Sequence, residues 1–350
     1  MSNVDGPANL PIGTIVGRFK ILKRIGAGSC GAVYSCIEVS TKKYAALKAE
    51  LLSDNGNGLK LEVQILKRLK GKKHVSQLIS CGKTESYCYM VVSLLGTSLS
   101  TFMRSKKFEF SVSTNVRIFI QMLFALKQIH QIGIVHRDLK PANMTIGRNG
   151  LDKKIIYIID FGLSREFTII EDSRRRLRKP REKCLFRGTV KYCSAATMEK
   201  VEQGRCDDLI SLFYICAEIN GPLPWHRCER IEEVLKMKKE YSDDSLFEFF
   251  PAYIELFKYT KKLTYNDPPD YCYLFKVLKG EMIKNGFKFS DPYEWEEYAD
   301  EFNSSFLPAG YNSKKSLATV TTQTIDCDTI DKFFDSHFSI KTFGSDKLGF

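Results

Sequence analysis

The stretch "GIVHRDLKPANMTIG", residues 133–147, places a group of polar residues between two apolar segments. The group consists of His136, Arg137, Asp138, Lys140 and Asn143. A solvated loop could carry such residues by chance. A loop that holds a triphosphate, a metal ion and a hydroxyl group in register would need them, because phosphoryl transfer requires cations, a base and metal ligands at one place.

The order H-R-D-x-K-x-x-N gives each polar residue a chemical role. Asp138 would accept the proton of a substrate hydroxyl, and Lys140 would neutralise the transferring phosphoryl group. Asn143 would bind a metal ion. Asp160, at the end of the apolar run "KKIIYIID" and followed by Phe-Gly, would chelate Mg²⁺ that bridges the phosphates of ATP.

A glycine-rich stretch lies far upstream. "GAGSCGAV", residues 26–33, fits G-x-G-x-x-G-x-V, in which glycines let backbone N–H groups approach phosphate oxygens. The pattern is weak alone, since glycines also make hairpin turns. It joins one predicted strand to another, whereas a dinucleotide-binding motif opens a helix, so ATP is favoured.

A lysine and a glutamate downstream of this loop can form an ion pair. Lys48, at the end of "AALK", belongs to the predicted strand "KYAALKAEL", and Glu62 lies on the predicted helix "LKLEVQILKRL". Paired, they would hold the ammonium group against the α- and β-phosphates. Taken singly, each is better explained as a solvated surface residue, since most lysines lie at the surface. It is the appearance of four spaced motifs in the expected order that favours phosphoryl transfer.

The chain as a whole resembles a eukaryotic protein kinase from about Phe19 to Tyr298. Within that family it resembles the casein kinase 1 group, on "SLLGTSL", "DFGLSREF", "FRGTVKYCS", "DDLISLFY", "GPLPW" and "DPPDYCYL", and the tau-tubulin kinase branch comes nearest. Lys140 follows the serine/threonine-kinase pattern. The resemblance implies an α+β bilobal fold, with a β-rich N-lobe at about 16–95 and a helical C-lobe at about 96–300. Residues 1–15 are expected to be a flexible leader, and residues 301–350 a Ser/Thr-rich tail, disordered or loosely docked.

The resemblance also implies a set of site residues. Thr189 would support Asp138 and Lys140, and Asp208 would anchor the backbone of the His136–Asp138 loop. Val33 and Ala46 would sandwich adenine, Val92 would be the gatekeeper, and the backbone of Leu95 would hydrogen-bond the base. The expected ATP-binding residues are Ile25, Gly26, Gly28, Gly31, Val33, Ala46, Lys48, Glu62, Val92 and Leu95, with Asn143 and Asp160 for Mg²⁺.

One segment departs from the usual pattern, and another is unusually basic. Where casein kinase 1 relatives have Ser-Ile-Asn, this chain has Ser194-Ala195-Ala196, which puts local packing in question. The stretch 173–187, "SRRRLRKPREKCLFR", contains a single acid. It is read either as a solvated or nuclear-localisation segment or as an anion site for acidic or phosphate-primed protein substrates, with Arg187 and Lys191 as its candidates. Relatives are generally active without activation-loop phosphorylation, so constitutive activity is expected.

Net charge, cysteine spacing and the motifs present limit the classes of partner that the protein is expected to bind. The net charge of +12 favours acidic partners, but no zinc, homeodomain or RNA-recognition motif supports specific nucleic-acid binding. The 11 cysteines are an odd number without metal-ligand spacing, and no signal peptide or membrane-length apolar run is evident. The expectation is a monomeric cytoplasmic protein, or one shared with the nucleus. The alternatives are a catalytically silent pseudokinase scaffold and, less favoured, a nucleic-acid-binding protein.

Overall fold

The computed structural model describes residues 8–28, 31–52, 58–309 and 326–344. The chain divides into two compact units. Unit 1 comprises residues 1–97, 146–162 and 296–324, and unit 2 comprises residues 98–145, 163–295 and 325–350. The first boundary between the units falls after residue 97. The units are not contiguous, however, because two later segments of the chain return to unit 1.

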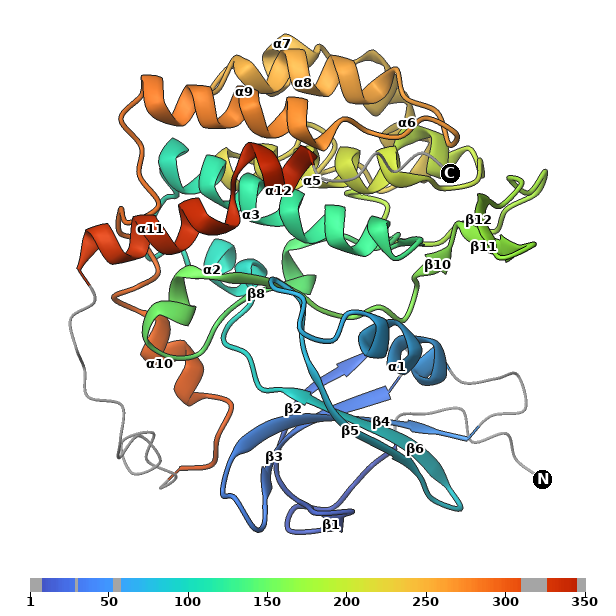
Figure 1. The fold of residues 1–350 in the computed structure, drawn as a ribbon, viewed down its shortest axis with the longest axis vertical. Helices are drawn as coiled ribbons and strands as arrows, with labels where there is room; N and C mark the ends of the chain where they lie inside the picture. The colour runs from blue at the N-terminus through green and yellow to red at the C-terminus, as the bar shows by residue number, and fades with distance from the viewer. Residues whose placement is uncertain (1–7, 29–30, 53–57, 310–325, 345–350) are drawn as a thin grey trace. The chain divides into compact units, whose positions relative to one another are not determined.

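Unit 1 is built on a six-stranded antiparallel sheet in the order β1-β2-β3-β4-β6-β5 (Figure 1). Its strands are β1 (Ile15–Val16), β2 (Phe19–Gly28), β3 (Gly31–Glu38), β4 (Tyr44–Leu51), β5 (Leu78–Lys83) and β6 (Tyr87–Ser93). Helix α1 (Gly58–Arg68) turns Leu59, Glu62, Ile65 and Leu66 inward. The predicted strands and helix are present, while β1 and β5 were not anticipated.

The start of the described chain packs into the sheet of unit 1. Ala8 and Leu10 are buried in the same apolar cluster as Ile21 and Leu47. The Tyr34 hydroxyl donates to the Ala8 carbonyl and accepts from the Leu10 N–H, both at 2.9 Å. The expected flexible leader therefore does not extend over residues 8–15. Apolar burial and two backbone hydrogen bonds fix this part, and residues 1–7 lie outside the described residues.

Two later segments of the chain complete unit 1. Strand β9 (Ile156–Ile158) joins through Ile158, whose N–H donates to the His74 carbonyl at 2.9 Å. Helix α10 (Ala299–Ser304) belongs to the other segment. The Asn303 Oδ1 there accepts from the Thr97 N–H at 2.9 Å, and its Nδ2 donates to the Arg148 carbonyl at 3.2 Å. Asn303, placed at the start of a tail by the sequence, is thus a buried structural residue.

Unit 2 is mainly helical. Together with the sheet of unit 1, it confirms the predicted α+β fold class. Its longer helices are α3 (Val112–Gln131), α5 (Arg205–Asn220), α6 (Ile231–Glu240), α8 (Ala252–Lys261), α9 (Tyr271–Lys284) and α11 (Cys327–His337). The shorter ones are α2 (Leu99–Ser105), α4 (Ala195–Met198), α7 (Asp243–Leu246) and α12 (Ile340–Gly344). Within the described residues, no helix combines the length and the apolarity needed to cross a bilayer.

An aromatic core holds the helices of unit 2 together. Phe213 of α5 lies 4.8 Å from Phe119 of α3 and 5.3 Å from Phe257 of α8, measured between ring centroids. Nearly every residue of α3 after its first turn is buried, including the polar ones. Helices α3 and α5 therefore form a rigid base for the loops that follow them.

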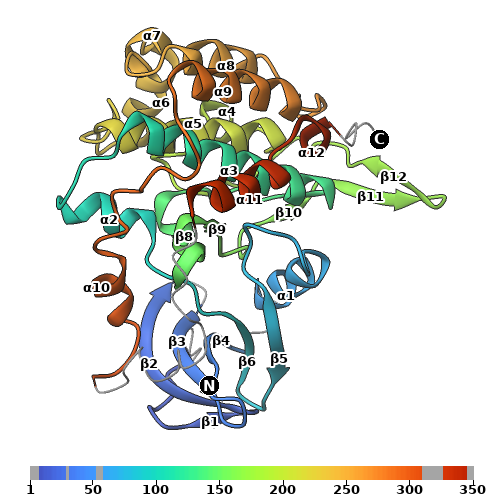
Figure 2. The same cartoon turned by 60° about the vertical axis from the view of Figure 1, so that its left-hand side comes forward.

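Short strands connect these helices to the loops of unit 2. Strand β7 (Ile134–Val135) pairs with β10 (Arg165–Glu166), and β11 (Thr168–Glu171) pairs with β12 (Arg174–Leu177). The β11–β12 hairpin turns at Asp172 and Ser173, both with positive φ, and projects from the helices (Figure 2). The remaining strand, β8 (Met144–Ile146), lies where the chain passes from unit 2 to unit 1.

The end of the described chain forms two helices that the sequence did not predict. On α11, Phe334 is fully buried and stacks on Phe289 at 4.9 Å. On α12, Phe343 stacks on Phe275 of α9 at 4.2 Å. The Ser/Thr-rich character assigned to residues 301–350 comes mainly from residues 310–325, which lie outside the described part of the chain. Because the whole range was judged by this composition, the spacing of the aromatic residues after it was not used to predict helices.

Candidate functional site

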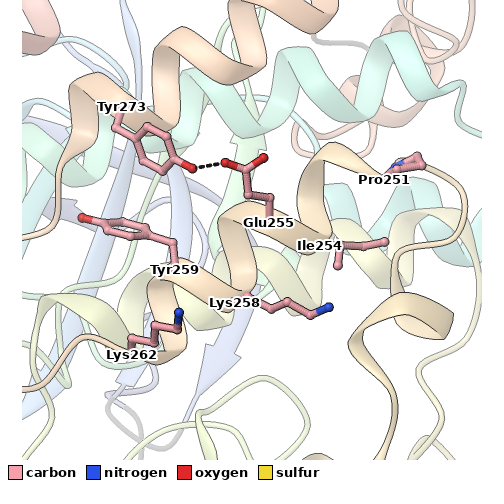
Figure 3. Close-up of a pocket in the computed structure, with 7 residues that line it drawn as sticks. All are labelled: Pro251, Ile254, Glu255, Lys258, Tyr259, Lys262 and Tyr273. Atoms are coloured by element: carbon pink, nitrogen blue, oxygen red, sulfur yellow. Dashed lines mark hydrogen bonds between the residues drawn. The ribbon is translucent and has the colours of Figure 1, made fainter.

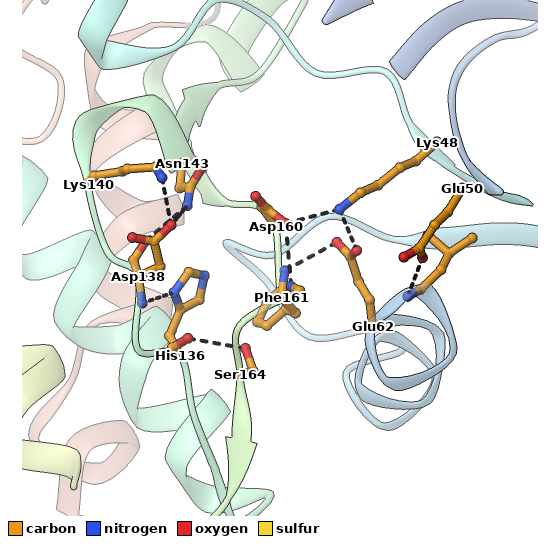
Figure 4. A network of polar contacts seen from close by, with 12 residues as sticks. Lys48, Glu50, Glu62, His136, Asp138, Lys140, Asn143, Asp160, Phe161 and Ser164 are labelled. Atoms are coloured by element: carbon orange, nitrogen blue, oxygen red, sulfur yellow. Dashed lines mark hydrogen bonds and ion pairs between the residues drawn. The ribbon is translucent and has the colours of Figure 1, made fainter. Parts of the chain in front are cut away.

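A network of charged side chains links β4, α1 and the end of the β9 segment in unit 1 (Figure 4). The Lys48 Nζ lies 2.7 Å from the Glu62 Oε2 and 3.0 Å from the Asp160 Oδ1. The other oxygen of Glu62 accepts from the Phe161 N–H at 3.1 Å. The predicted Lys48–Glu62 pair is therefore present, and it also fixes the backbone just after Asp160.

The electrostatics of this network keep the lysine charged. Burial lowers the pKa of Lys48, but the carboxylates of Glu62 and Asp160 more than offset that effect and hold the pKa above its ordinary value. A permanently protonated ammonium group beside a half-exposed carboxylate is suited to polyphosphate, and the Asp160 carboxylate to a hard cation.

Strand register gathers most of the expected nucleotide-binding residues of unit 1. Val33 lies opposite Lys48, and Ala46 lies opposite Val92. Because opposed residues share a face and residues two apart share it too, these four side chains line one face of the sheet. Gly26 pairs with Val33 on the same face.

The remaining nucleotide-binding residues lie around that face. Ile25 lies at a shift in the register of β2, and Leu95 lies in the loop after β6. Gly28 and Gly31 end and begin the paired strands, with the loop tip between them outside the described residues. Gly31 has φ +142°, and a Cβ there would approach the Ala49 carbonyl oxygen to 2.4 Å, so only glycine fits.

The second polar network lies in unit 2 around Asp138 (Figure 4). The Lys140 Nζ contacts the Asp138 Oδ2 at 2.6 Å, and the Thr189 hydroxyl donates to the Asp138 Oδ1 at 2.7 Å. Lys140 and Thr189 are themselves 3.4 Å apart. The Asn143 Nδ2 donates to the Asp138 carbonyl at 2.9 Å. All four predicted catalytic residues are therefore in one network.

The loop that carries Asp138 is anchored from helix α5. The Asp208 carboxylate accepts from the N–H groups of His136 and Arg137 at 2.7 and 2.9 Å, and from the His130 Nε2 at 2.9 Å. Burial alone would raise the pKa of Asp208, but these donors hold it below its ordinary value. The anchor stabilises Arg137 in a left-handed conformation, φ 69°.

Each network contains one of the two residues that the sequence predicts to bind magnesium, Asn143 in unit 2 and Asp160 in unit 1. The Asn143 amide nitrogen is engaged with Asp138, which leaves the amide oxygen for a cation. Asp160 supplies a carboxylate, and a Cβ on Gly162, two residues later, would stand 3.3 Å from its Oδ1. Hard oxygen donors of this kind suit Mg²⁺ held partly by phosphates. Among the described residues, no cluster of three or more His, Cys, Asp or Glu forms a self-contained metal site.

The two candidate anion-site residues, Lys191 and Arg187, differ in their contacts and in their exposure to solvent. Lys191 is ion-paired with Glu218 and lies over the Tyr192 ring, 5.6 Å from its centroid. Arg187 is exposed, and its carbonyl accepts from Gln203 at 2.9 Å. The structure thus gives Lys191 an internal counter-ion that the sequence did not reveal, while the Arg187 side chain is open to solvent.

The unusual Ser194-Ala195-Ala196 segment is well packed. The Ser194 hydroxyl caps α4 by accepting from the Thr197 N–H at 3.0 Å, and it also donates to Asp207. The preceding segment is held by Lys238, whose Nζ donates to the carbonyls of Val190 and Cys193, each at 2.6 Å. The question over local packing is answered by these contacts.

A groove lies elsewhere in unit 2, along α8 and α9 (Figure 3). It has a volume of about 520 Å³ and is lined by Pro251, Ile254, Glu255, Lys258, Tyr259, Lys262 and Tyr273. None of the motif residues lines it. The chemistry of the chain is therefore assigned to the two polar networks.

Several residues that hold the segments around these networks could not be singled out from the sequence. His130, Lys238 and Glu202 each lie in stretches whose local pattern is that of an ordinary helix or loop. Each is buried beside a partner distant in sequence. No one-dimensional signal marks such residues, because only the fold brings the partners together.

Comparison with known proteins agrees with this geometry. The family described as "Protein kinase domain" matches residues 19–266. A Caenorhabditis elegans protein named as a putative serine/threonine-protein kinase is 41% identical over 350 residues, covering 99% of each chain. A Dictyostelium discoideum protein named as a probable serine/threonine-protein kinase is 35% identical over 285 residues, which is 81% of this chain and 57% of that one.

Proposed function

Because this chain belongs to the protein kinase family, we propose that it is an active serine/threonine kinase of the casein kinase 1 type that transfers the γ-phosphate of ATP to proteins. The observation that carries the proposal is the hydrogen-bonded set of Asp138, Lys140 and Thr189. Resemblance of the quoted motifs supports the subgroup, and the tau-tubulin kinase branch is the nearest candidate within it.

The unit 2 network would act on the acceptor hydroxyl. Asp138 has one oxygen held by Thr189 and one by Lys140, so its carboxylate is oriented to take the proton of a serine or threonine. Lys140 would offset the charge of the phosphoryl group during transfer. Thr189 acts as a positioning residue, because its contact is with Asp138.

The unit 1 network would act on the nucleotide. Lys48 would contact the α- and β-phosphates, and Glu62 would keep its ammonium group in place. Val33 and Ala46 would cover the adenine, near the backbone of Leu95. Asp160 and Asn143 would hold Mg²⁺, which when bound neutralises the phosphate oxygens.

The proposed substrates are acidic or phosphate-primed protein sites. The exposed Arg187 and the basic segment around it support this preference, because guanidinium groups bind phosphate with charge-assisted hydrogen bonds. Lys191 would contribute only by exchanging Glu218 for the substrate anion. We further propose that activity does not require phosphorylation of the segment between Asp160 and Ser194.

Phosphate transfer from Mg-ATP to casein, by wild type and by Asp138→Asn, tests the proposal. We expect the rate to fall by about 10²–10⁴-fold in the variant, because the general base is lost. Asp244→Asn is the matched control, since Asp244 is exposed and ion-paired with Lys258 away from both networks, and it should behave as wild type. Primed and unprimed peptides, compared in the same assay, test the substrate preference.

The silent-scaffold alternative makes a different prediction in this assay. Purified wild type would then bind ATP without transferring phosphate to any of the substrates. Equal rates for wild type and Asp138→Asn would instead show that the phosphate transfer comes from another source, and would contradict the assignment of the base.

A further inference from the structure

Glu202 is a buried carboxylate in the loop before α5, facing the basic segment. Its side chain is 2% exposed, against 40% for its partner Arg181. The guanidinium group of Arg181 donates to both carboxylate oxygens, Nε at 2.6 Å and the terminal nitrogen at 2.9 Å. The Arg165 Nε lies 3.5 Å away. Glu202 therefore joins two arginines that are distant along the segment that begins after Asp160.

The neighbouring residue holds the same segment at a second point. Gln203 donates to the Arg187 carbonyl at 2.9 Å, and the Arg181 backbone N–H donates to Glu202 at 3.3 Å. Residues 202 and 203 thus fix the stretch 181–187 at both ends. Thr189, which donates to Asp138, lies two residues after that stretch.

A second path of contacts leads from Glu202 to the loop of Asp138. The Arg137 guanidinium group donates to the carbonyls of Leu163 and Ser164, at 2.7 and 3.5 Å. Arg165, the next residue, faces Glu202, and it also pairs with Val135 across β7 and β10. Both arginines that contact Glu202 therefore lie close in the chain to residues that hold the catalytic loop.

The charges around Glu202 explain why a buried carboxylate is needed. The pKa of Arg137 is lowered to about 10, first by burial and then by the charges of Arg165 and Arg181, while the charge of Glu202 opposes them. Burial would raise the pKa of Glu202, but its hydrogen bond from Arg181 and the charge of Arg165 hold it below its ordinary value. Glu202 is thus ionised at neutral pH and offsets the arginines.

We infer that Glu202 is a positioning residue, a built-in counter-ion that holds the segment 163–189 in its catalytic arrangement and replaces a phosphate there. A phosphate added to such a segment acts by pairing with arginines and ordering the chain. Here a carboxylate makes the arginine pairing without any modification. This inference rests on the proposed kinase activity. It gives a structural reason why that activity would not require phosphorylation.

Steady-state kinetics of Glu202→Gln, at saturating casein, tests this role. The substitution keeps size and removes the charge. We expect kcat to fall by about tenfold or more, with the KM for ATP within about twofold, because the residue acts on the acceptor half of the reaction. Glu202→Asp, which keeps the charge, should recover much of the loss. Glu199→Gln is the matched control, as Glu199 is exposed and ion-paired at the surface.

Arg181→Gln provides a second route to the same answer, since Arg181 is partly exposed and its loss leaves the core intact. It should lower kcat in the same way, and the double variant should be less than additively impaired because both residues serve one contact. Amide hydrogen exchange should become faster in residues 165–187 of each variant but not in α5.

The outcomes separate the two proposals. If wild type transfers phosphate and Glu202→Gln and Arg181→Gln match it, the inference is overturned while the kinase assignment stands. If phosphatase treatment removes phosphate from the segment and abolishes wild-type activity, the inference is also overturned. If neither wild type nor Glu199→Gln transfers phosphate, the proposed function itself fails.

Discussion

At the scale of single residues, the backbone at the two motif loops is strained. Arg137 and Asp160 have φ values of 69° and 65°, in a region that costs a non-glycine residue roughly 1–2 kcal/mol. Asp208 stabilises the first loop through two backbone N–H groups, and Glu62 stabilises the second through Phe161. The buried carboxylates therefore hold the polar side chains in conformations that the loops would not adopt alone.

Lys238 is the residue whose charge state should depend most directly on pH. Its burial lowers the pKa to about 8, whereas an unfolded lysine keeps its proton to about 10.4. Between these values the unfolded chain binds more protons, so the free energy of unfolding should rise with pH. Compared with Lys238→Met, wild type should gain about 2 kcal/mol from pH 8 to pH 10.

Urea unfolding of both proteins at several pH values measures this difference. Titrating groups distant from Lys238 are common to wild type and variant and largely cancel. The Cys193 thiol contacts the Lys238 Nζ at 3.9 Å and does not cancel, so both proteins carry Cys193→Ala. A wild-type-minus-variant difference that stays constant with pH would contradict the lowered pKa of Lys238. It would mean that the carbonyls of Val190 and Cys193 keep the ammonium form fully stabilised.

The sequence predicts the residues that would act on substrate or cofactor better than it predicts the residues that hold those side chains in place. Asp138, Lys140, Asn143 and Asp160 are recognisable because the reaction demands those residue types at fixed spacing. Glu202 and Asn303 are not recognisable in this way. Each is defined by partners that only the fold brings near, so any polar residue in the same place would give the same local pattern.

At the scale of elements, regular spacing of apolar residues predicted strands and helices correctly. Amino-acid composition did not predict the helices near the end of the described chain. Strands β2, β3 and β4 and helix α1 have regular apolar spacing, and all were expected. Helices α10 and α11 instead follow polar or Ser/Thr-rich stretches. Their stability comes from tertiary contacts, such as Phe334 on Phe289, which composition does not record.

Phe334→Ala tests how firmly α11 is docked. The ring is fully buried, so its removal should destabilise the docked helix by about 3–5 kcal/mol. Limited proteolysis and amide exchange of residues 326–344 would show the loss. Phe333→Ala is the matched control, because this ring is only half-buried, and its effect should stay below about 1.5 kcal/mol. Equal effects of the two substitutions would refute specific docking by Phe334.

At the scale of the whole molecule, the fold is assembled from segments distant in the sequence. Unit 1 takes in residues 146–162 and 296–324. The return of β9 supplies Asp160 to the network of Lys48 and Glu62, and the return of α10 supplies Asn303 to Thr97. Cutting the chain into consecutive stretches of sequence would not assign these two segments to unit 1. The sequence does not show which distant strands and loops pair with each other.

The net charge of +12 is also a property of the whole chain, and it predicts how salt affects substrate use. A positive field raises the encounter rate with anionic substrates, and added salt screens it over about 10 Å at 0.1 M. From low to high salt, kcat/KM for an acidic peptide should fall about tenfold. An uncharged peptide of the same length should change little.

Arg187→Gln separates this field from a local anion site. If the whole-chain field dominates, the variant should show nearly the wild-type dependence on salt, with a slightly lower kcat/KM for the acidic peptide. If Arg187 binds the substrate anion directly, the variant should lose most of the preference for acidic over uncharged peptide at every salt concentration. Equal salt dependence for acidic and uncharged peptides would contradict both effects, because neither the field nor the site acts on a substrate without charge.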